Sequence, residues 1–459
     1  MRKINLSITI YYEHFIEKTF SESIQNYFVK TKDLGRVRYI NLDNAATTPP
    51  FLSVQKAIEK YLTSYGSVHR GTGTKSKIST DIYEESREVI KRFVNAPKDS
   101  YVILTPNTTS AMNAAAHFFS FLKGKVAVSA IEHSSSWLPW IKAEGTKALG
   151  KNQFSIQDLN STNEKVQKLG RKQVIQYGVN ENFEFNLQDI ERLFQENDIK
   201  AFVLTASSNA TGYCPDIKRI GKIVHKHGAL FIVDACQFLQ HHTVDMQAMG
   251  IDFLAASGHK FYAPFGGGFL IGPKKFLDQF LPYEIGGGNL PYITKEGEFL
   301  RYRTQLAHDP GTPNAVGAVS MATALEQLEK IGIANVEKYE STLTQKAFNA
   351  LKNNPKVKFY VSEKHLSTVL PFNIEGKNFR DVAEALNNRF GIGVRAGSFC
   401  VYNVIRHLLK IEDESHIIAD VKAGKENAVP GFIRASFSLC NTEEDVKRFA
   451  QAIEILTQE

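Results

Sequence analysis

The chain has 459 residues, of which 43% are hydrophobic and 22% are charged, and this ordinary globular composition excludes an intrinsically disordered protein. Its net charge of +7 is spread along the chain without a run of five like charges, which argues against a protein that binds nucleic acid. The cysteines form no C-x-x-C pair, so we expect no disulfide framework and no metal site; they are Cys214, Cys236, Cys400 and Cys440.

The N-terminal segment shows neither a membrane anchor nor a secretory signal. No stretch of the chain approaches the ~20 apolar residues that a membrane span needs. The first residues are basic and turn apolar only briefly before Glu13, without a small-residue cleavage site. We therefore predict a cytoplasmic protein without a membrane partner, whose N-terminus forms a peripheral helix or strand.

Short apolar runs alternate with helical patterns between about residues 40 and 273. Runs rich in Val, Ile and Phe predict strands that are buried on both faces, at 101–105, 125–129, 201–205, 230–233 and 252–255. Apolar residues three and four positions apart predict helices over 79–94 and 216–227. This alternation predicts an α/β fold with a mostly parallel sheet, in a large domain over residues 41–321.

The pattern changes after residue 322, where we expect a smaller α+β domain over residues 322–459. Helices are predicted at 323–345, 380–390 and 442–456, and strands at 357–361, 368–374, 391–394 and 432–437. We expect the N-terminal segment, residues 1–40, to pack against this domain. Two polar stretches, 145–171 and 411–430, are interpreted as insertions.

Polar residues follow each predicted strand of the large domain, where the ligand of an open α/β sheet binds. Lys260, next to apolar and aromatic residues, can bind a carbonyl cofactor covalently. Asp234 can hold a pyridinium nitrogen, and His133 can stack on the ring. Thr108 and Thr109 start a helix and can bind a phosphate, although on this motif alone plain helix capping is the favoured explanation.

These motifs resemble the class V aminotransferase superfamily, and within it the cysteine desulfurase and selenocysteine lyase branch. The resemblance runs from Leu42 to the C-terminus, roughly nine-tenths of the chain, and is most specific in Ser257-Gly-His-Lys260 and Val233-Asp-Ala-Cys-Gln237. It implies the fold type I of pyridoxal phosphate enzymes, with pyridoxal 5′-phosphate held by Lys260. The other cofactor contacts that it implies are Asp234, Gln237, His133, Asn209, Thr108, Thr109, Ser257 and His259.

The same resemblance implies a homodimer, because Thr312 lies in a loop, residues 310–314, that reaches the phosphate of the neighbouring subunit. Arg434 matches the arginine that grips the substrate carboxylate, a task that suits a guanidinium fork. Cys400 falls on the position of the nucleophilic cysteine, whereas without the resemblance it would be read as a small buried residue. Further substrate contacts are expected from Ala45, His69, Arg70 and Arg395.

We therefore expect a cysteine desulfurase that converts L-cysteine to L-alanine and leaves a persulfide on Cys400. The sulfur would pass to an acceptor protein for iron–sulfur clusters or thiolated cofactors. The alternative is a class V aminotransferase or another C–S or C–Se lyase in which Cys400 is not the nucleophile. A non-catalytic scaffold is disfavoured by the intact Lys260, Asp234, His133 and Arg434.

Overall fold

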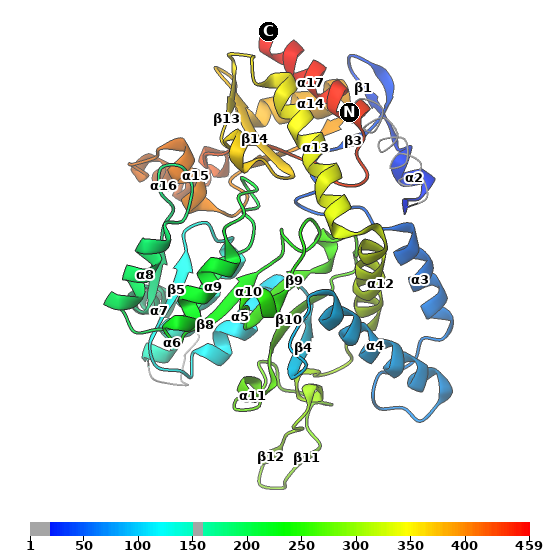
Figure 1. Ribbon diagram of the computed structural model, residues 1–459, viewed down its shortest axis with the longest axis vertical. Helices are drawn as coiled ribbons and strands as arrows, with labels where there is room; N and C mark the ends of the chain where they lie inside the picture. Colours follow the sequence, from blue (N-terminus) through cyan, green and yellow to red (C-terminus); the bar gives the residue numbers. More distant parts are fainter. Residues whose placement is uncertain (1–18, 150–158) are drawn as a thin grey trace.

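The computed structural model describes residues 19–149 and 159–459, and within them the largest sheet has seven strands in the order β4-β10-β9-β8-β7-β5-β6 (Figure 1). β10 runs antiparallel to β4 and β9, while all pairs from β9 to β6 are parallel. The predicted α/β fold with a mostly parallel sheet is confirmed. The strands are β4 (Ser100–Thr105), β5 (Lys125–Ser129), β6 (Val174–Tyr177), β7 (Ile199–Thr205), β8 (Leu230–Asp234), β9 (Phe253–Ser257) and β10 (Gly268–Pro273).

Both faces of this sheet are covered, which explains why its strands are continuously apolar. In β7, Phe202 and Leu204 enter the hydrophobic cluster on one face, while Ala201 and Val203 enter the cluster on the other. The first cluster includes side chains of α3 (Leu52–Thr63), α4 (Thr74–Phe93), α8 (Leu187–Glu196), α9 (Ile217–Lys226) and α12 (Ala315–Ile331). The second includes side chains of α5 (Thr108–Phe119), α6 (Ser134–Leu149) and α11 (Lys274–Leu277).

A second, antiparallel sheet lies beyond one end of the large sheet, in the order β13-β14-β17-β16 (Figure 1). Its strands are β13 (Val357–Phe359), β14 (Val369–Ile374), β16 (Arg395–Gly397) and β17 (Phe432–Ser436). Its own hydrophobic cluster joins β13, β14 and β17 to α13 (Ile333–Leu351), α14 (Phe379–Phe390) and α17 (Glu443–Gln458). β15 (Ile392–Gly393) pairs with β3 (Ile40–Asn41), which links the start of the chain to this sheet.

The N-terminal residues that the structure describes contact the C-terminal elements. α2 (Glu22–Gln25) is followed by a hairpin of β1 (Phe28–Thr31) and β2 (Gly35–Arg38). The Lys32 N–H donates to the Asn388 carbonyl of α14 at 2.9 Å, and Arg38 pairs with Asp445, which belongs to the capping box of α17. The peripheral helix or strand predicted for the first residues lies outside the described residues, which begin at residue 19.

The sequence prediction missed two strands of the large sheet and joined two helices. β6 and β10 follow a polar stretch and a glycine-rich stretch, respectively, and neither has the long apolar run of the central strands.

The pattern predicted as one helix over 323–345 is divided between α12 and α13. Gly332 separates them with a φ of 83°, a backbone conformation that favours glycine.

The two stretches interpreted as insertions are largely helical. The first covers the end of α6 and most of α7 (Leu159–Gln173), with residues 150–158 outside the described part. A Cβ on Gly145 would lie 2.0 Å from the Val166 carbonyl oxygen, and one on Gly170 would lie 1.9 Å from that of Ile141. Glycine therefore permits the close approach of α6 and α7. The second stretch follows α15 (Tyr402–Leu409) and contains α16 (Ser415–Lys422).

Two smaller features complete the described chain. β11 (Tyr292–Ile293) and β12 (Phe299–Leu300) form a hairpin that projects at the end opposite the second sheet (Figure 1), and α10 (Met246–Met249) precedes β9. None of the helices in residues 19–149 and 159–459 combines the length and the apolar character that crossing a membrane requires.

Candidate active site

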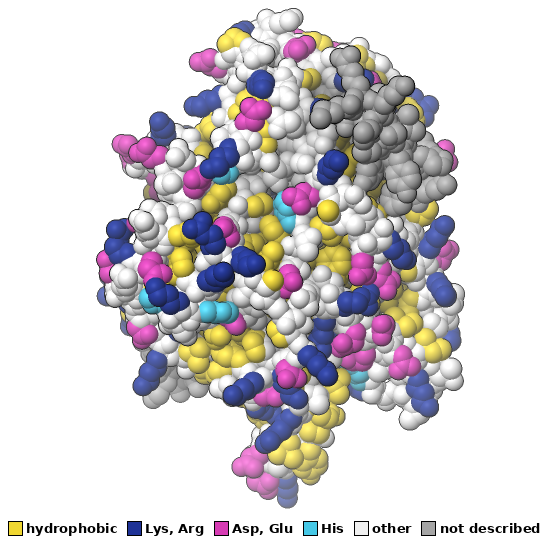
Figure 2. Space-filling model, viewed as in Figure 1, with side chains coloured by type: hydrophobic (Ala, Val, Ile, Leu, Met, Phe, Trp, Pro, Cys, Tyr) yellow, Lys and Arg dark blue, Asp and Glu magenta, His cyan; other side chains and the backbone are white. Residues whose placement is uncertain are grey.

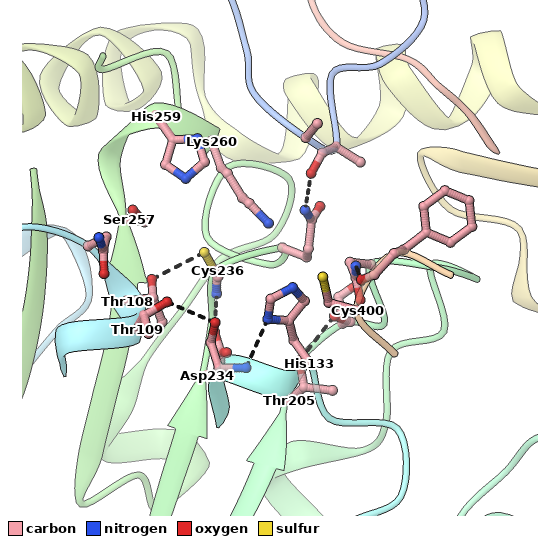
Figure 3. A pocket seen from close by; sticks show the side chains of 18 of the residues that line it. Thr108, Thr109, His133, Thr205, Asp234, Cys236, Ser257, His259, Lys260 and Cys400 are labelled. Carbon is pink, nitrogen blue, oxygen red and sulfur yellow. Dashed lines mark hydrogen bonds between the residues drawn. The ribbon is translucent and has the colours of Figure 1, made fainter. Parts of the chain in front are cut away.

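A cavity of about 310 Å³ opens where β7, β8 and β9 end, between the large sheet and the second sheet (Figure 3). This volume lies at the lower end of the roughly 300–1,000 Å³ of small-molecule sites. Most of the predicted site residues line it: Ala45, Thr108, Thr109, His133, Asn209, Asp234, Gln237, Ser257, His259, Lys260, Arg395, Cys400 and Arg434. The topology brings them together because the carboxyl ends of parallel strands lie at one edge of a sheet.

Lys260 ends a short 3₁₀ turn, Gly258–Lys260, that directly follows β9. Its amine makes no hydrogen bond or ion pair with any described residue, and Figure 3 shows it extending into the cavity. The turn is fixed because the His259 carbonyl accepts hydrogen bonds from the Thr47 hydroxyl at 3.0 Å and from the Thr48 N–H at 3.0 Å. Lys260 therefore presents an unpaired amino group from a turn that hydrogen bonds hold in place.

His259 is close enough to Lys260 for their charges to interact. Burial, and secondarily the Lys260 charge, lower the pKa of His259 to about 4. The ring is therefore neutral at pH 7, and a phosphate would meet one N–H donor here rather than a cation.

Asp234 ends β8 and is buried beneath the cavity. One carboxylate oxygen accepts the Cys236 N–H at 2.9 Å, and the other accepts the Ser136 hydroxyl. Burial, with a smaller contribution from the Asp234 charge, raises the pKa of the nearby Glu132 to about 8. Glu132 is therefore mostly protonated at pH 7, so it adds no negative charge beside the Asp234 carboxylate.

His133 follows β5 and lines the cavity wall (Figure 3). Its Nδ1 accepts the Ser135 N–H at 3.1 Å, so in the neutral ring the proton sits on Nε2. Burial, and next the Lys260 charge, lower the pKa of His133. The neutral ring is suited to stacking on an aromatic cofactor.

The start of α5 is arranged to receive an anion. The Asn107 side chain, rather than either threonine, caps the helix by accepting the Ser110 N–H at 3.0 Å. The backbone N–H groups of Thr108 and Thr109 have no acceptor within the described part of the chain. The Thr108 hydroxyl lies 3.2 Å from Cys236 Sγ, and the Thr109 hydroxyl lies 2.8 Å from that of Ser135. These free donors and hydroxyls at a helix N-terminus favour phosphate binding over capping.

Arg434 projects from β17 on the opposite side of the cavity and is 2% exposed. Its Nη1 donates to the Asn209 carbonyl at 2.8 Å, and its Nη2 donates to Asp43 Oδ1 at 3.1 Å. Burial lowers the pKa of Arg434 to about 10, so the guanidinium stays charged at pH 7. Its buried Nε has no partner among the described residues, and because a guanidinium carries five N–H groups, donors remain for a ligand.

Arg395 lies directly opposite Arg434 on β16, and like charges in such a pair repel. Asp43 offsets this repulsion because its other oxygen lies 3.5 Å from Arg395 Nη1. Two guanidinium groups with one carboxylate leave a net positive charge at this wall. The wall is therefore suited to a substrate carboxylate.

Cys400 is exposed on the loop between β16 and α15. Phe399 and Cys400 both have positive φ, 53° and 56°, and such non-glycine conformations cost on the order of 1–3 kcal/mol each. The Cys400 carbonyl accepts two hydrogen bonds from Ser134, one from its N–H at 2.9 Å and one from its side-chain hydroxyl at 2.8 Å. Asn209 Nδ2 donates to the Phe399 carbonyl at 2.9 Å. These bonds hold the loop so that the thiol lines the cavity (Figure 3).

Two partly exposed cysteines have environments that disfavour a thiolate. Burial raises the pKa of Cys236, which lies beneath the cavity, and raises the pKa of Cys440 to about 12. Cys400 is the exposed cysteine of the chain, so its thiol is the most accessible of the four.

Three predicted residues do not line the cavity of this single chain. His69 Nε2 lies 2.6 Å from Glu84, and Arg70 extends to the Gly287 carbonyl at 3.4 Å. Thr312 lies exposed in the loop before α12. The cavity also includes residues for which no role was predicted: Ala46, Asn107, Ser135, Thr205, Ser207, Cys236 and Phe399. Most of them lie within two positions of a predicted site residue in the sequence. Widening each motif by two residues would therefore have included them.

The donor set fits the cofactor expected from the sequence. Pyridoxal phosphate has an aldehyde, a basic ring nitrogen and a phosphate. The cavity offers a free amine on Lys260, a carboxylate on Asp234 and an anion site at Thr108 and Thr109.

Comparison with known families gives a match over nearly the whole chain. The family described as Aminotransferase class-V matches residues 40–158 and 154–449. A probable cysteine desulfurase from Halalkalibacterium halodurans is 31% identical over 420 residues, covering 90% of this chain and 92% of that protein. A probable cysteine desulfurase from Methanothermobacter thermautotrophicus is 29% identical, with 93% and 98% covered.

Solved structures show the same similarity. The apo structure of a cysteine desulfurase from Thermococcus onnurineus NA1 superposes with a TM-score of 0.76 at 28% identity, covering 92% of this chain and 95% of that one. The cysteine desulfurase CsdA from Escherichia coli, in an S-sulfonic acid form, has a TM-score of 0.77 at 25% identity, with 97% and 98% covered. The expected fold type I is therefore confirmed.

Proposed function

The chain belongs to the class-V aminotransferase family, and on that basis we propose that it is a pyridoxal phosphate-dependent cysteine desulfurase that converts L-cysteine to L-alanine. The observation that carries this proposal is the exposed Cys400, held by Ser134 and Asn209 on a strained loop at a cavity that Lys260 and Arg434 also line.

The cofactor would be held by residues from four elements. Lys260 would bind its aldehyde carbon, Asp234 its ring nitrogen, and Thr108 and Thr109 its phosphate, while His133 would stack on the ring. Gln237, Asn209, Ser257 and His259 are the remaining proposed contacts. When bound, pyridoxal phosphate supplies an electron sink for the electrons released at the substrate Cα.

Arg434 and Arg395 orient the substrate through its carboxylate. Arg434 is already positioned by Asn209 and Asp43, so little ordering is needed when substrate binds. Ala45 and Ala46 line the same part of the cavity with small side chains and leave room for the substrate. His69 and Arg70, at a greater distance, are proposed to act near the substrate entrance.

Lys260 Nζ is the proposed base that takes the Cα proton and later returns it. The Cys400 thiolate attacks the sulfur of the substrate. The substrate Cβ–S bond breaks, an S–S bond forms at Cys400, and L-alanine leaves after protonation at Cβ. The products are L-alanine and a Cys400 persulfide, so every sulfur atom is accounted for.

The persulfide would pass its terminal sulfur to an acceptor protein that serves iron–sulfur clusters or thiolated cofactors. The exposure of Cys400 supports this transfer because an acceptor thiol can approach from outside. We further propose a homodimer in which Thr312 reaches the neighbouring site. A cytoplasmic location stays a prediction from the sequence.

The alternative, an aminotransferase or lyase that does not use Cys400, gives no reason for the strained loop or for its hydrogen bonds to Ser134 and Asn209. The test is production of alanine and sulfide from L-cysteine with reductant. We expect activity in the wild type and none in Cys400→Ala or Lys260→Ala, with the visible absorbance of the lysine-bound cofactor retained in Cys400→Ala. Full activity in Cys400→Ala would favour the alternative.

A further inference from the structure

A second constellation of reactive groups lies outside the cavity. Cys214 Sγ, in the segment between β7 and α9, lies 3.5 Å from His242 Nε2. The other ring nitrogen of His242, Nδ1, lies 3.2 Å from Glu337 Oε1 on α13. A nucleophile, a base within hydrogen-bonding reach and a third group that orients the base form the arrangement that activates thiols in enzymes.

The surroundings of His242 favour its charged form. Burial opposes this charge, but the hydrogen bonds and charges of Cys214 and Glu337 outweigh burial and raise the pKa of His242 to about 10. The adjacent His241 pairs instead with Glu340, so it does not compete for Glu337. An imidazolium beside a thiol stabilises the thiolate, which is the nucleophilic form of cysteine.

Cys214 differs from the other thiols of the chain in this respect. All three thiols are partly exposed, but desolvation raises the pKa of Cys236 and of Cys440, and neither has a histidine partner among the described residues. Cys214 is half-buried, and Glu337, at the outer end of the constellation, is 50% exposed, so solvent reaches this part of the surface. The Cys214 Sγ also lies 3.3 Å from the Gly212 carbonyl, to which the thiol donates a hydrogen bond.

We propose that Cys214 is a second reactive thiol and a modification site for low-molecular-weight disulfides. The Cys214 thiolate attacks one sulfur of the disulfide R–S–S–R. The S–S bond of the reagent breaks, a mixed disulfide Cys214–S–S–R forms, and R–S⁻ leaves with the electron pair. The exchange consumes no oxidant beyond the disulfide itself, and it is independent of the reaction proposed at Cys400.

The test uses the full chain carrying Cys400→Ser, which removes the exposed thiol at the cavity. The probe is 5,5′-dithiobis(2-nitrobenzoate), a disulfide whose released thiolate is coloured, and peptide mass spectrometry identifies the labelled cysteine. We expect a fast phase on Cys214 that persists at pH 6.5, where an ordinary thiol of pKa near 8.5 is only about 1% ionised.

His242→Gln should slow that phase about tenfold at pH 6.5, because the thiolate loses its cationic partner. Glu337→Gln, at an exposed position that tolerates substitution, should slow it by a smaller factor. Glu329→Gln on α12 is the matched control, since its side chain is 53% exposed but contacts Arg92 instead. Folding of each variant is checked by circular dichroism.

The proposal is overturned by any of three results. Cys214 could resist labelling, it could react no faster than Cys236 or Cys440, or its rate at pH 6.5 could be the same in folded Glu337→Gln and His242→Gln as in the parent.

Discussion

At the scale of single residues, the chemistry of the site depends on which groups carry charge at neutral pH. Burial raises the pKa of Glu132 to about 8, so this carboxyl near Asp234 is mostly protonated. Arg434 stays cationic although burial lowers its pKa to about 10. His133 and His259 have lowered pKa values and are neutral. The cavity therefore offers the Asp234 carboxylate to the cofactor ring and a cationic guanidinium to the substrate carboxylate.

Arg434→Lys tests the role of the guanidinium. A lysine keeps the charge but cannot donate to Asn209, Asp43 and a substrate carboxylate in one plane. Loss of a charge-assisted hydrogen bond costs about 1.5–3 kcal/mol, so kcat/KM for L-cysteine should fall roughly 10- to 100-fold. Steady-state kinetics with a cofactor absorbance control measure this. An unchanged kcat/KM would show that Arg434 does not bind substrate.

At the scale of elements, the loop between β16 and α15 is held by α6 and by the segment after β7. Two consecutive non-glycine residues with positive φ persist there because Ser134 and Asn209 satisfy the loop carbonyls. Ser134 and Cys400 are separated by 266 positions in sequence, so no local pattern could have predicted this contact.

Ser134→Ala removes the hydroxyl bond to the Cys400 carbonyl and leaves the N–H bond in place. We expect alanine production to fall about 3- to 10-fold, consistent with the roughly 0.5–1.5 kcal/mol of one hydrogen bond. The cofactor absorbance should be unchanged because Ser134 is not among the residues that line the cavity. Rescue by Ser134→Thr, which restores a hydroxyl, separates loop positioning from a general structural defect. A wild-type rate in Ser134→Ala would contradict this role.

The packing of α6 against α7 gives a separate prediction about stability. Gly170→Ala places a Cβ against the Ile141 carbonyl, so the helices must separate, and we expect a loss of roughly 1–3 kcal/mol in the free energy of unfolding. Gly178→Ala is the matched control, because no atom lies within 4 Å of a Cβ at that position. Urea denaturation compares the two variants. Equal stabilities would contradict the close approach of these helices.

At the scale of the whole molecule, the sequence predicted the residues of the site better than the residues that hold them in place. Lys260, Asp234 and His133 were predictable because each follows a buried strand, and parallel strands bring their carboxyl ends together. No role was predicted for Asp43 or Ser134, because each acts through a contact with a segment far away in the sequence. None was predicted for Asn107, because the sequence alone does not decide which of several neighbouring polar residues caps the helix. β10 was missed because its apolar run, residues 269–271, is short and lies between glycines, which gives a weak pattern.

The projecting hairpin bears on the proposed dimer. Its large apolar side chains are exposed, with Tyr292 at 62%, Ile293 at 59% and Leu300 at 57%. In Figure 2 the projection carries a hydrophobic patch beside charged side chains. Exposed apolar patches of this kind mark interaction sites, so we expect Ile293→Asp with Leu300→Asp to shift the protein from dimer to monomer. Sedimentation velocity measures this, with Lys295→Asp as the charge control. An unchanged dimer would exclude the hairpin from the interface.

The most direct test of the central claim is to find the substrate sulfur on the protein. The enzyme is mixed with one equivalent of L-cysteine labelled with a heavy sulfur isotope, without reductant, then alkylated and digested for mass spectrometry. The account predicts one additional labelled sulfur atom on the Cys400 peptide, an equal amount of L-alanine, and the same result in a Cys214→Ser variant. Alanine formed in equal yield with no labelled sulfur on Cys400 would contradict it.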